Sequence, residues 1–209
     1  MKTSFPLFAG ALLGSLILAA CGPQSEKADK VQVAPATEAT MPADASGAVP
    51  AWSASNDGIG PINGATAFDA ATVTALLPGS EIKTAYLHEE GGETPIITAY
   101  GPQELSLELQ GAKGKVSRIL AQGGPVVGPK GEKIMDSFKV SGFAATDCVL
   151  GADRMSGAAL CRRADAPNLA LVYGAPGELK GNPGDAPDAA ALAEKGFLRE
   201  FLWQAPIAN

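Results

Sequence analysis

The chain has 209 residues, with 16 Lys and Arg against 22 Asp and Glu, and a formal net charge of −6. This balance argues against nucleic acid as a partner, because nucleic-acid-binding surfaces carry clustered Lys and Arg. It argues equally against broad electrostatic adhesion to anionic lipid, and solubility alone accounts for the acidic charge.

The first 20 residues have the three parts of a secretory signal sequence. Lys2 is the charged end, residues 5–18 are a short apolar core, and small residues follow. The apolar run is shorter than the roughly 20 residues of a membrane-spanning helix. It ends in Leu18-Ala19-Ala20-Cys21, which resembles the bacterial lipobox at all four positions. The resemblance implies cleavage after Ala20 and a diacylglycerol on the Cys21 sulfur; the alternative is an ordinary secretory signal with an unmodified thiol.

Lipidation of Cys21 would anchor the mature protein without a membrane span. The resemblance also implies an acyl chain such as palmitate on the new amino terminus, and several acyl chains hold a protein where one is marginal. Gly22 follows Cys21, whereas an Asp there resembles the inner-membrane retention signal of Gram-negative lipoproteins. We therefore expect a lipid anchor in the periplasmic face of the outer membrane of a Gram-negative cell.

Residues 21–56 are expected to be a disordered tether that begins at the lipidated cysteine. They are rich in Ala, Pro, Ser and Thr and hold few large apolar side chains, so they cannot bury enough surface to offset the cost of ordering. A flexible chain of this length reaches on the order of 30 Å. Residues 57–209 remain as a single domain of ordinary size.

The first half of this domain is predicted to form one helix and a set of strands. The helix covers residues 70–77, with Asp69 as its N-cap and Pro78-Gly79 at its end. In the third strand leucines alternate with polar residues, which predicts one buried and one polar face. Because parallel neighbours need long crossovers, the short connections at 89–93 and 111–114 predict an antiparallel meander. The predicted strands are 82–88, 95–100, 105–109 and 115–121.

The second half is predicted to return to strands after a Gly- and Pro-rich loop. A short helical segment is expected at 135–140, and a second helix from Asp188 to Lys195. The last strand is apolar on both faces, which is typical of a covered strand rather than an edge. Its residues are 197–203, and the earlier strands are 158–163 and 169–173, joined by a turn at 165–168. The fold class is α+β, a single domain of mainly antiparallel β-sheet with two or three short helices.

Three cysteines occur in the chain, and lipid would consume Cys21. Cys148 and Cys161 remain as a pair in an exported protein, where disulfides persist, so we expect one disulfide. The competing explanation is two ligands of a zinc site, which needs further Cys or His ligands. His88 is the only histidine and lies far away in the sequence.

The order of several short motifs resembles one bacterial family. Asp57-Gly58-Ile59-Gly60, the run from Lys115 to Ile119, the cysteine pair, Tyr173 before a Gly-rich loop and a closing strand with Trp203 occur in that order. Together they resemble the sigma-E-regulated (RpoE-regulated) envelope lipoproteins, a domain family of unknown function. The resemblance implies an outer-membrane lipoprotein linked to envelope stress, and it supplies no catalytic residues.

No motif in the chain predicts catalytic, metal-binding or cofactor-binding residues. Gly58-Ile59-Gly60 lacks the third glycine of a dinucleotide-binding loop, so it predicts a turn. Ser137 next to Asp136 has no nearby base, and a Ser/His/Asp triad would have to use His88. Glu89, Glu90 and Glu93 could supply the carboxylates of a glycosidase, but a glycine-rich hairpin tip is usually a solvated loop.

Two classes of function remain. The first is a non-catalytic binding domain in the periplasm, whose partner is an unidentified envelope protein or glycan. An inhibitor of a cell-wall lytic enzyme or protease is one form of it. The second class is an envelope hydrolase that uses His88 or the acidic hairpin.

Overall fold

The computed structural model describes residues 52–206 except 90 and 178. The predicted signal sequence, the cleavage site at Ala20, the lipidation site at Cys21 and nearly all of the predicted tether lie outside the described residues. Among the residues that the structure describes, no helix is long and apolar enough to cross a membrane.

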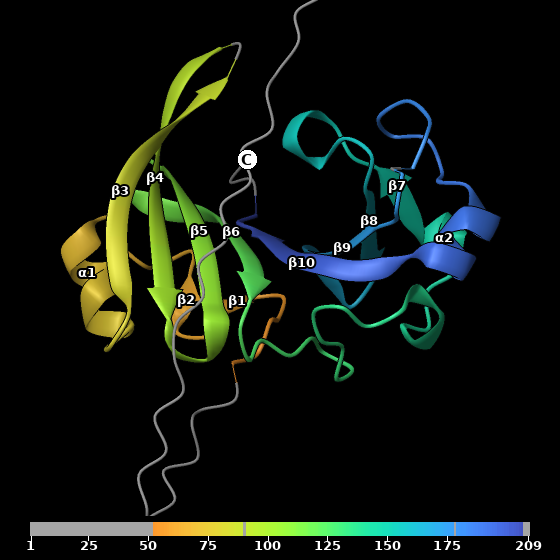
Figure 1. The fold of residues 1–209 in the computed structure, drawn as a ribbon. Helices are drawn as coiled ribbons and strands as arrows, with labels where there is room; N and C mark the ends of the chain where they lie inside the picture. The colour runs from red at the N-terminus through yellow and green to blue at the C-terminus, as the bar shows by residue number, and fades with distance from the viewer. Residues whose placement is uncertain (1–51, 90, 178, 207–209) are drawn as a thin grey trace, which may run out of the picture. The chain divides into compact units, whose positions relative to one another are not determined.

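The described residues fold around an eight-stranded antiparallel sheet, flanked by two short helices and a small two-stranded hairpin (Figure 1). The strand order in the large sheet is β3-β4-β5-β6-β10-β9-β8-β7. The expected α+β class with a mainly antiparallel sheet is therefore confirmed. The elements are β1 (Gly58–Ile59), β2 (Ile62–Asn63), α1 (Ala70–Leu76), β3 (Glu81–Glu89), β4 (Gly92–Gly101), β5 (Leu105–Ala112), β6 (Lys115–Gly123), β7 (Cys148–Leu150), β8 (Ala159–Arg163), β9 (Ala166–Gly174), α2 (Ala189–Lys195) and β10 (Phe197–Gln204).

The predicted meander is present as β3 to β6, each strand paired with the next. The strands are longer than predicted, because β3 and β4 pair as far as Glu89 and Gly92 and shorten the hairpin loop. Leu107 and Leu109 of β5 are buried as expected. The expectation of a polar outer face on β5 is wrong at Glu108, which is only 7% exposed because Arg154 lies over it and donates from Nη2 to Oε2 at 2.9 Å.

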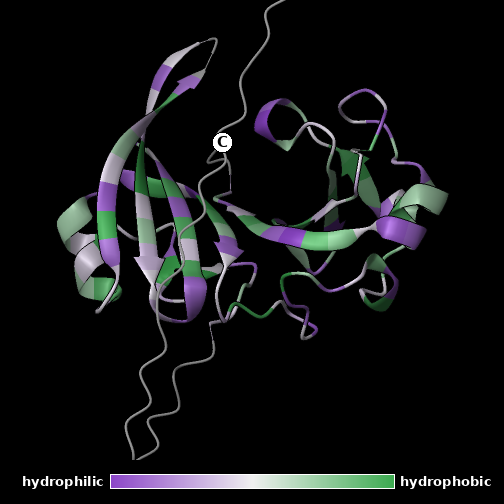
Figure 2. Cartoon of the chain, in the orientation of Figure 1, coloured by the Kyte–Doolittle hydropathy of each residue, from purple (hydrophilic) through white to green (hydrophobic). Residues whose placement is uncertain are grey.

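Strand β10 is the covered strand that its apolar sequence predicted. It pairs with β6 on one side and with β9 on the other. Phe201 and Trp203 pack into the main core, whereas Leu202 packs into a smaller cluster on the opposite face of the sheet. Figure 2 shows hydrophobic and hydrophilic residues alternating along the strands, in keeping with two faces of different polarity.

Both helices begin where their N-caps predicted. Asp69 accepts a hydrogen bond from the backbone N–H of Thr72 at 2.8 Å, and Asp188 caps α2 in the same way. Of the short helical segment expected at 135–140, the structure has only a single 3₁₀ turn, Phe138–Val140. Met135 has a left-handed backbone, with φ 75°, and its N–H donates to Leu198 of β10 at 2.7 Å, so this segment is held as an extension of the sheet.

The turn predicted at 165–168 lies earlier in the chain. Residues 164–165 form it, and Pro167 already belongs to β9. The proline is tolerated because the pairing of β8 with β9 shifts register between Arg162 and Arg163, next to this turn. Strand β7 and the small β1–β2 hairpin were not predicted as strands, because two or three residues show no periodicity.

The folded domain begins before Asp57, the boundary expected from composition. Ala54 is 1% exposed, and its N–H donates to Val127 at 2.9 Å. The carbonyl of Asn56 accepts a hydrogen bond from the indole of Trp203 at 2.8 Å. Residues 52–56 are therefore part of the packed domain rather than of the tether, because long-range contacts order a segment whose composition suggests disorder.

The predicted disulfide joins Cys148 to Cys161. The two residues face each other across β7 and β8, and both are buried in the main core. The alternative of a zinc site at these cysteines is wrong, because each sulfur is bonded to the other.

Reduction of this disulfide is expected to lower the free energy of unfolding by about 3 kcal/mol, because a closed loop of this size restricts the unfolded chain. Urea denaturation of a Cys21→Ser chain, with and without reductant, measures the loss on a protein that holds only this cysteine pair. The Cys148→Ala/Cys161→Ala chain should match the reduced protein. Equal midpoints in the oxidised and reduced samples would contradict the prediction.

A buried ion pair between Glu132 and Arg163 lies at the edge of the main core. Arg163 contacts the Glu132 carboxylate, donates to the carbonyl of Ser141 at 2.7 Å, and lies over the ring of Phe143 at 4.1 Å. Burial by itself raises the pKa of Glu132, but hydrogen bonds from Arg163 and from backbone N–H groups, that of Lys130 included, outweigh burial and hold this pKa below its ordinary value of 4.5. The pair therefore stabilises the fold only while Glu132 is ionised.

Glu132→Gln is expected to destabilise the domain by about 3 kcal/mol at neutral pH, because it leaves the Arg163 charge buried without its partner. In the unaltered chain the unfolded state binds the Glu132 proton more readily, so stability is lost as pH falls below about 4.5. Glu132→Gln removes that component of the pH dependence. Denaturation midpoints from pH 3 to 7 measure both effects, with Glu194→Gln on the exposed face of α2 as control. If the midpoint changes with pH equally in the unaltered chain, in Glu132→Gln and in Glu194→Gln, the assignment is refuted.

Candidate functional site

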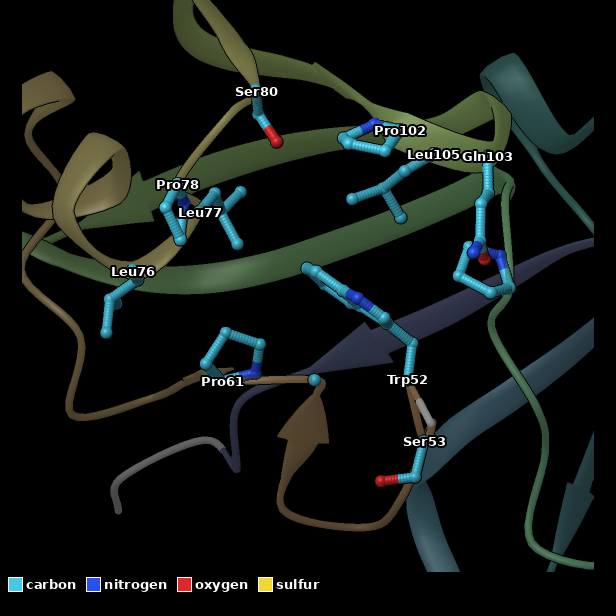
Figure 3. Close-up of a pocket in the computed structure, with 12 residues that line it drawn as sticks. Trp52, Ser53, Pro61, Leu76, Leu77, Pro78, Ser80, Pro102, Gln103 and Leu105 are labelled. Carbon is cyan, nitrogen blue, oxygen red and sulfur yellow. The ribbon is translucent and has the colours of Figure 1, made fainter. Parts of the chain in front are cut away.

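An apolar cavity of about 530 Å³ lies at one end of the β3–β6 meander. In this antiparallel arrangement the start of β3, the end of β4, the start of β5 and the end of β6 share one end of the sheet. The α1–β3 connection, the β4–β5 connection and the chain that leaves β6 therefore meet there. The cavity, called the Trp52 cavity below, is drawn in Figure 3. It is lined by Trp52, Ser53, Gly60, Pro61, Leu76, Leu77, Pro78, Ser80, Pro102, Gln103, Leu105 and Pro125.

The end of α1 supplies one wall of the cavity. Pro78 and Gly79, with φ 81° at the glycine, prevent the helix from continuing. Leu77 is buried, at 2% exposed, while Leu76 beside it is only half-buried. The termination of the helix therefore leaves one leucine in the core and one on the cavity wall.

Trp52 crosses the cavity from the other side. Figure 3 shows its ring extending between Pro61 and Leu105. The backbone of Trp52 is held by Val127, whose N–H donates to the Trp52 carbonyl at 2.7 Å. The ring lies against Gly60, where an added Cβ would stand 2.4 Å from Cε3 of the indole. Gly60 is required here because its φ is 57° and because any side chain would displace the indole.

The connection between β4 and β5 forms the rim and has an unusual backbone. Gln103 and Glu104 are consecutive non-glycine residues with φ of 57° and 61°. Left-handed conformations cost free energy for residues with a side chain, and they cluster at functional sites. Beside them, Gly101 allows the Ser80 hydroxyl to approach, since an added Cβ would lie 2.6 Å from its Oγ.

The chemistry of the lining is that of a binding site for an uncharged group. None of its side chains is ionisable, and the polar side chains among them are Ser53, Ser80 and Gln103 besides the indole N–H of Trp52. Within the described ranges no group of three or more His, Cys, Asp and Glu side chains is placed to hold a metal ion.

A second hollow, of about 320 Å³, is polar and carries charges of both signs. Arg163, which lines it, already forms an ion pair with Glu132. Burial and the nearby Arg118 lower the pKa of Arg162, which donates to Gln204 at 3.0 Å. These contacts give both arginines of the hollow a role in the fold, so the Trp52 cavity is the stronger candidate.

The structure brings His88 together with one carboxylate, that of Glu93. Nδ1 of His88 lies 3.3 Å from the Glu93 carboxylate, on the β3–β4 hairpin, and the two side chains are 79% and 60% exposed. The site is open to water on a two-stranded ribbon. The Ser/His/Asp form of the hydrolase hypothesis needs a hydroxyl nucleophile as well, and the hydroxyl of Ser137 instead accepts a hydrogen bond from the N–H of Lys139.

The other candidate residues have structural roles. Ser137 accepts a hydrogen bond from the N–H of Lys139 at the start of the 3₁₀ turn. Asp136 accepts from the N–H of Lys133 at 2.7 Å. Gly58-Ile59-Gly60 forms β1 and the turn into β2, as predicted, and its last glycine supports the Trp52 ring.

Sequence patterns did not reveal the Trp52 cavity. Its twelve residues come from five separate segments. Four of these residues are prolines, and in a sequence a proline predicts only a loop or turn. One available signal was Trp52 itself, a large apolar residue at the end of a stretch that otherwise resembles a tether.

No family model matches the chain, and no curated protein matches it. A similar structure is the crystal structure of the uncharacterized protein yfeY from Escherichia coli, which is 18% identical in sequence and superimposes with a TM-score of 0.58. The match covers 74% of this chain and 99% of that chain. At this level of identity the likeness concerns the fold alone.

Proposed function

We propose that this protein is a lipid-anchored envelope protein whose folded domain is a non-catalytic binding module, with the Trp52 cavity as its binding site. The observation that carries the proposal is the cavity itself, with its uncharged lining drawn from five segments. Concave, mostly apolar sites with a few polar groups are the usual form of small-molecule sites. The lipobox-like Leu18-Ala19-Ala20-Cys21 and the Gly22 that follows support a position on the periplasmic face of the outer membrane. The motif order supports membership of the sigma-E-regulated lipoproteins and a link to envelope stress.

A second candidate function rests on the β3–β4 hairpin. Strand β5 pairs with β4 only from Ile96 onward, so the outer part of the hairpin extends beyond the sheet. Tyr86 on this part is 62% exposed. An isolated two-stranded ribbon is marginally stable in water, which favours a protein partner for it, such as a lytic enzyme or protease that the domain inhibits.

The cavity assignment predicts saturable binding of an uncharged apolar probe. N-phenyl-1-naphthylamine should bind the Cys21→Ser chain at one site per domain, with an increase in its fluorescence. Leu76→Lys, which places a charge on the half-buried cavity wall, should weaken binding at least tenfold. Leu87→Lys, at another half-buried leucine on the β3–β4 hairpin, is the control and should leave binding unchanged. Equal effects of the two substitutions would contradict the assignment.

The anchor assignment predicts that Cys21→Ser releases the protein from membranes. The unaltered chain should fractionate with the outer membrane and gain mass from its acyl chains, whereas Cys21→Ser should be recovered in the soluble periplasmic fraction. Fractionation and intact mass measure both properties. Membrane association that persists in Cys21→Ser would show that lipid is not the anchor.

A further inference from the structure

We propose that the Trp52 cavity binds a single acyl chain of a separate lipid molecule, leaving the head group in solvent. The inference rests on the proposed binding function and names its ligand class. Three features of the lining support it: its side chains carry no charge, several of its backbone carbonyls already accept hydrogen bonds within the fold, and its polar side chains lie at its periphery.

The lining excludes the charged part of any ligand. Its twelve residues include no Asp, Glu, Lys, Arg or His. Burying a charge without a partner is costly, whereas each buried methylene contributes roughly 0.8 kcal/mol. A saturated chain therefore gains from every atom that enters the cavity.

The lining also offers few partners to a peptide. The carbonyl groups of Trp52 and Ser53 already accept hydrogen bonds from Val127 and Gly60, at 2.7 and 2.9 Å. The carbonyls of Leu77 and Pro102 accept from Ser80 and Leu105 in the same way.

The four prolines of the lining add no N–H donors. A bound peptide would bury N–H and C=O groups that need partners, whereas an acyl chain needs none. This difference favours an acyl chain over a proline-rich or extended peptide.

The cavity is largely formed before a ligand arrives. Prolines fix the backbone of its walls, and the contact of Trp52 with Gly60 holds the indole in place. At the rim, Gln103 and Glu104 are held in a left-handed backbone conformation that an unconstrained chain would rarely adopt. Preformed sites avoid the cost of ordering side chains and loops on binding.

The polar side chains of the lining stand at its periphery. Figure 3 shows Ser80, Gln103 and Ser53 around the group formed by Trp52 and the leucines and prolines. Gln103 and Ser53 are exposed to solvent. The lining offers a head group neutral hydrogen-bonding side chains and none that is charged, so affinity should depend on chain length far more than on head-group charge.

The test is displacement of N-phenyl-1-naphthylamine from the Cys21→Ser chain by octanoate, decanoate, laurate, myristate and palmitate, each below its micelle concentration. Affinity should rise by roughly fourfold for each added methylene and then level off once the cavity is full. Decanol should displace the probe as well as decanoate within about threefold, because none of the lining side chains is charged.

Two pairs of variants place the binding in the cavity. Leu76→Lys should weaken palmitate binding at least tenfold, and Leu87→Lys should not. Gly60→Ala should push the Trp52 ring into the cavity and weaken binding, whereas Gly114→Ala changes a glycine of similar φ, 74°, with open space around it and should bind normally. Circular dichroism shows which variants are folded, and the Leu76→Lys and Leu87→Lys pair remains decisive if Gly60→Ala does not fold.

The outcomes separate this inference from the proposed function. If the probe binds in the cavity but fatty acids fail to displace it, or do so without dependence on chain length, the acyl-chain inference is overturned while the binding function stands. If a proline-rich peptide displaces the probe and fatty acids do not, the acyl-chain inference is likewise overturned while the binding function stands. If the lipidated mature chain in detergent fails to bind palmitate while Cys21→Ser binds it, the protein's own acyl chain fills the cavity, and the inference of a separate lipid is overturned. Absence of probe binding refutes the proposed function itself.

Discussion

The insertion of β10 between β6 and β9 is the interaction on which the rest of the fold depends. It joins the β3–β6 meander to the β7–β9 strands in one sheet. Without it, β6 and β9 would present unpaired edges, which are prone to pairing with other chains. The same strand places Trp203 in the core, where the indole donates to the carbonyl of Asn56 and fixes the segment that enters the domain. The strand that joins the two halves of the sheet therefore also holds the entry segment in place.

The cavity is a consequence of that arrangement. The α1–β3 connection, the β4–β5 connection and the chain after β6 lie at one end of the meander. The entry segment brings Trp52 over them because residues 53–54 are hydrogen-bonded to Val127 and Gly60. The site therefore includes the first two residues that the structure describes, Trp52 and Ser53.

Charge in the described domain is concentrated away from the cavity. Glu108, Glu132 and Glu200 are buried, and each meets an arginine. Such pairs need both partners, because a lone buried charge is strongly destabilising. They occupy the second face of the sheet and the edge near β8, so the polar interior serves the fold while the apolar cavity remains free for a ligand.

The sequence by itself determined the local elements: the caps at Asp69 and Asp188, the leucine alternation of β5 and the pairing of Cys148 with Cys161. These depend on spacing and on neighbours within a few residues, so a pattern suffices. The tertiary structure alone decided that β10 lies between β6 and β9, that Glu108 is covered by Arg154, that residues 52–56 are ordered and that five segments enclose a cavity. Those features arise from contacts between residues far apart in the chain, and neither periodicity nor composition carries information about which distant surfaces meet.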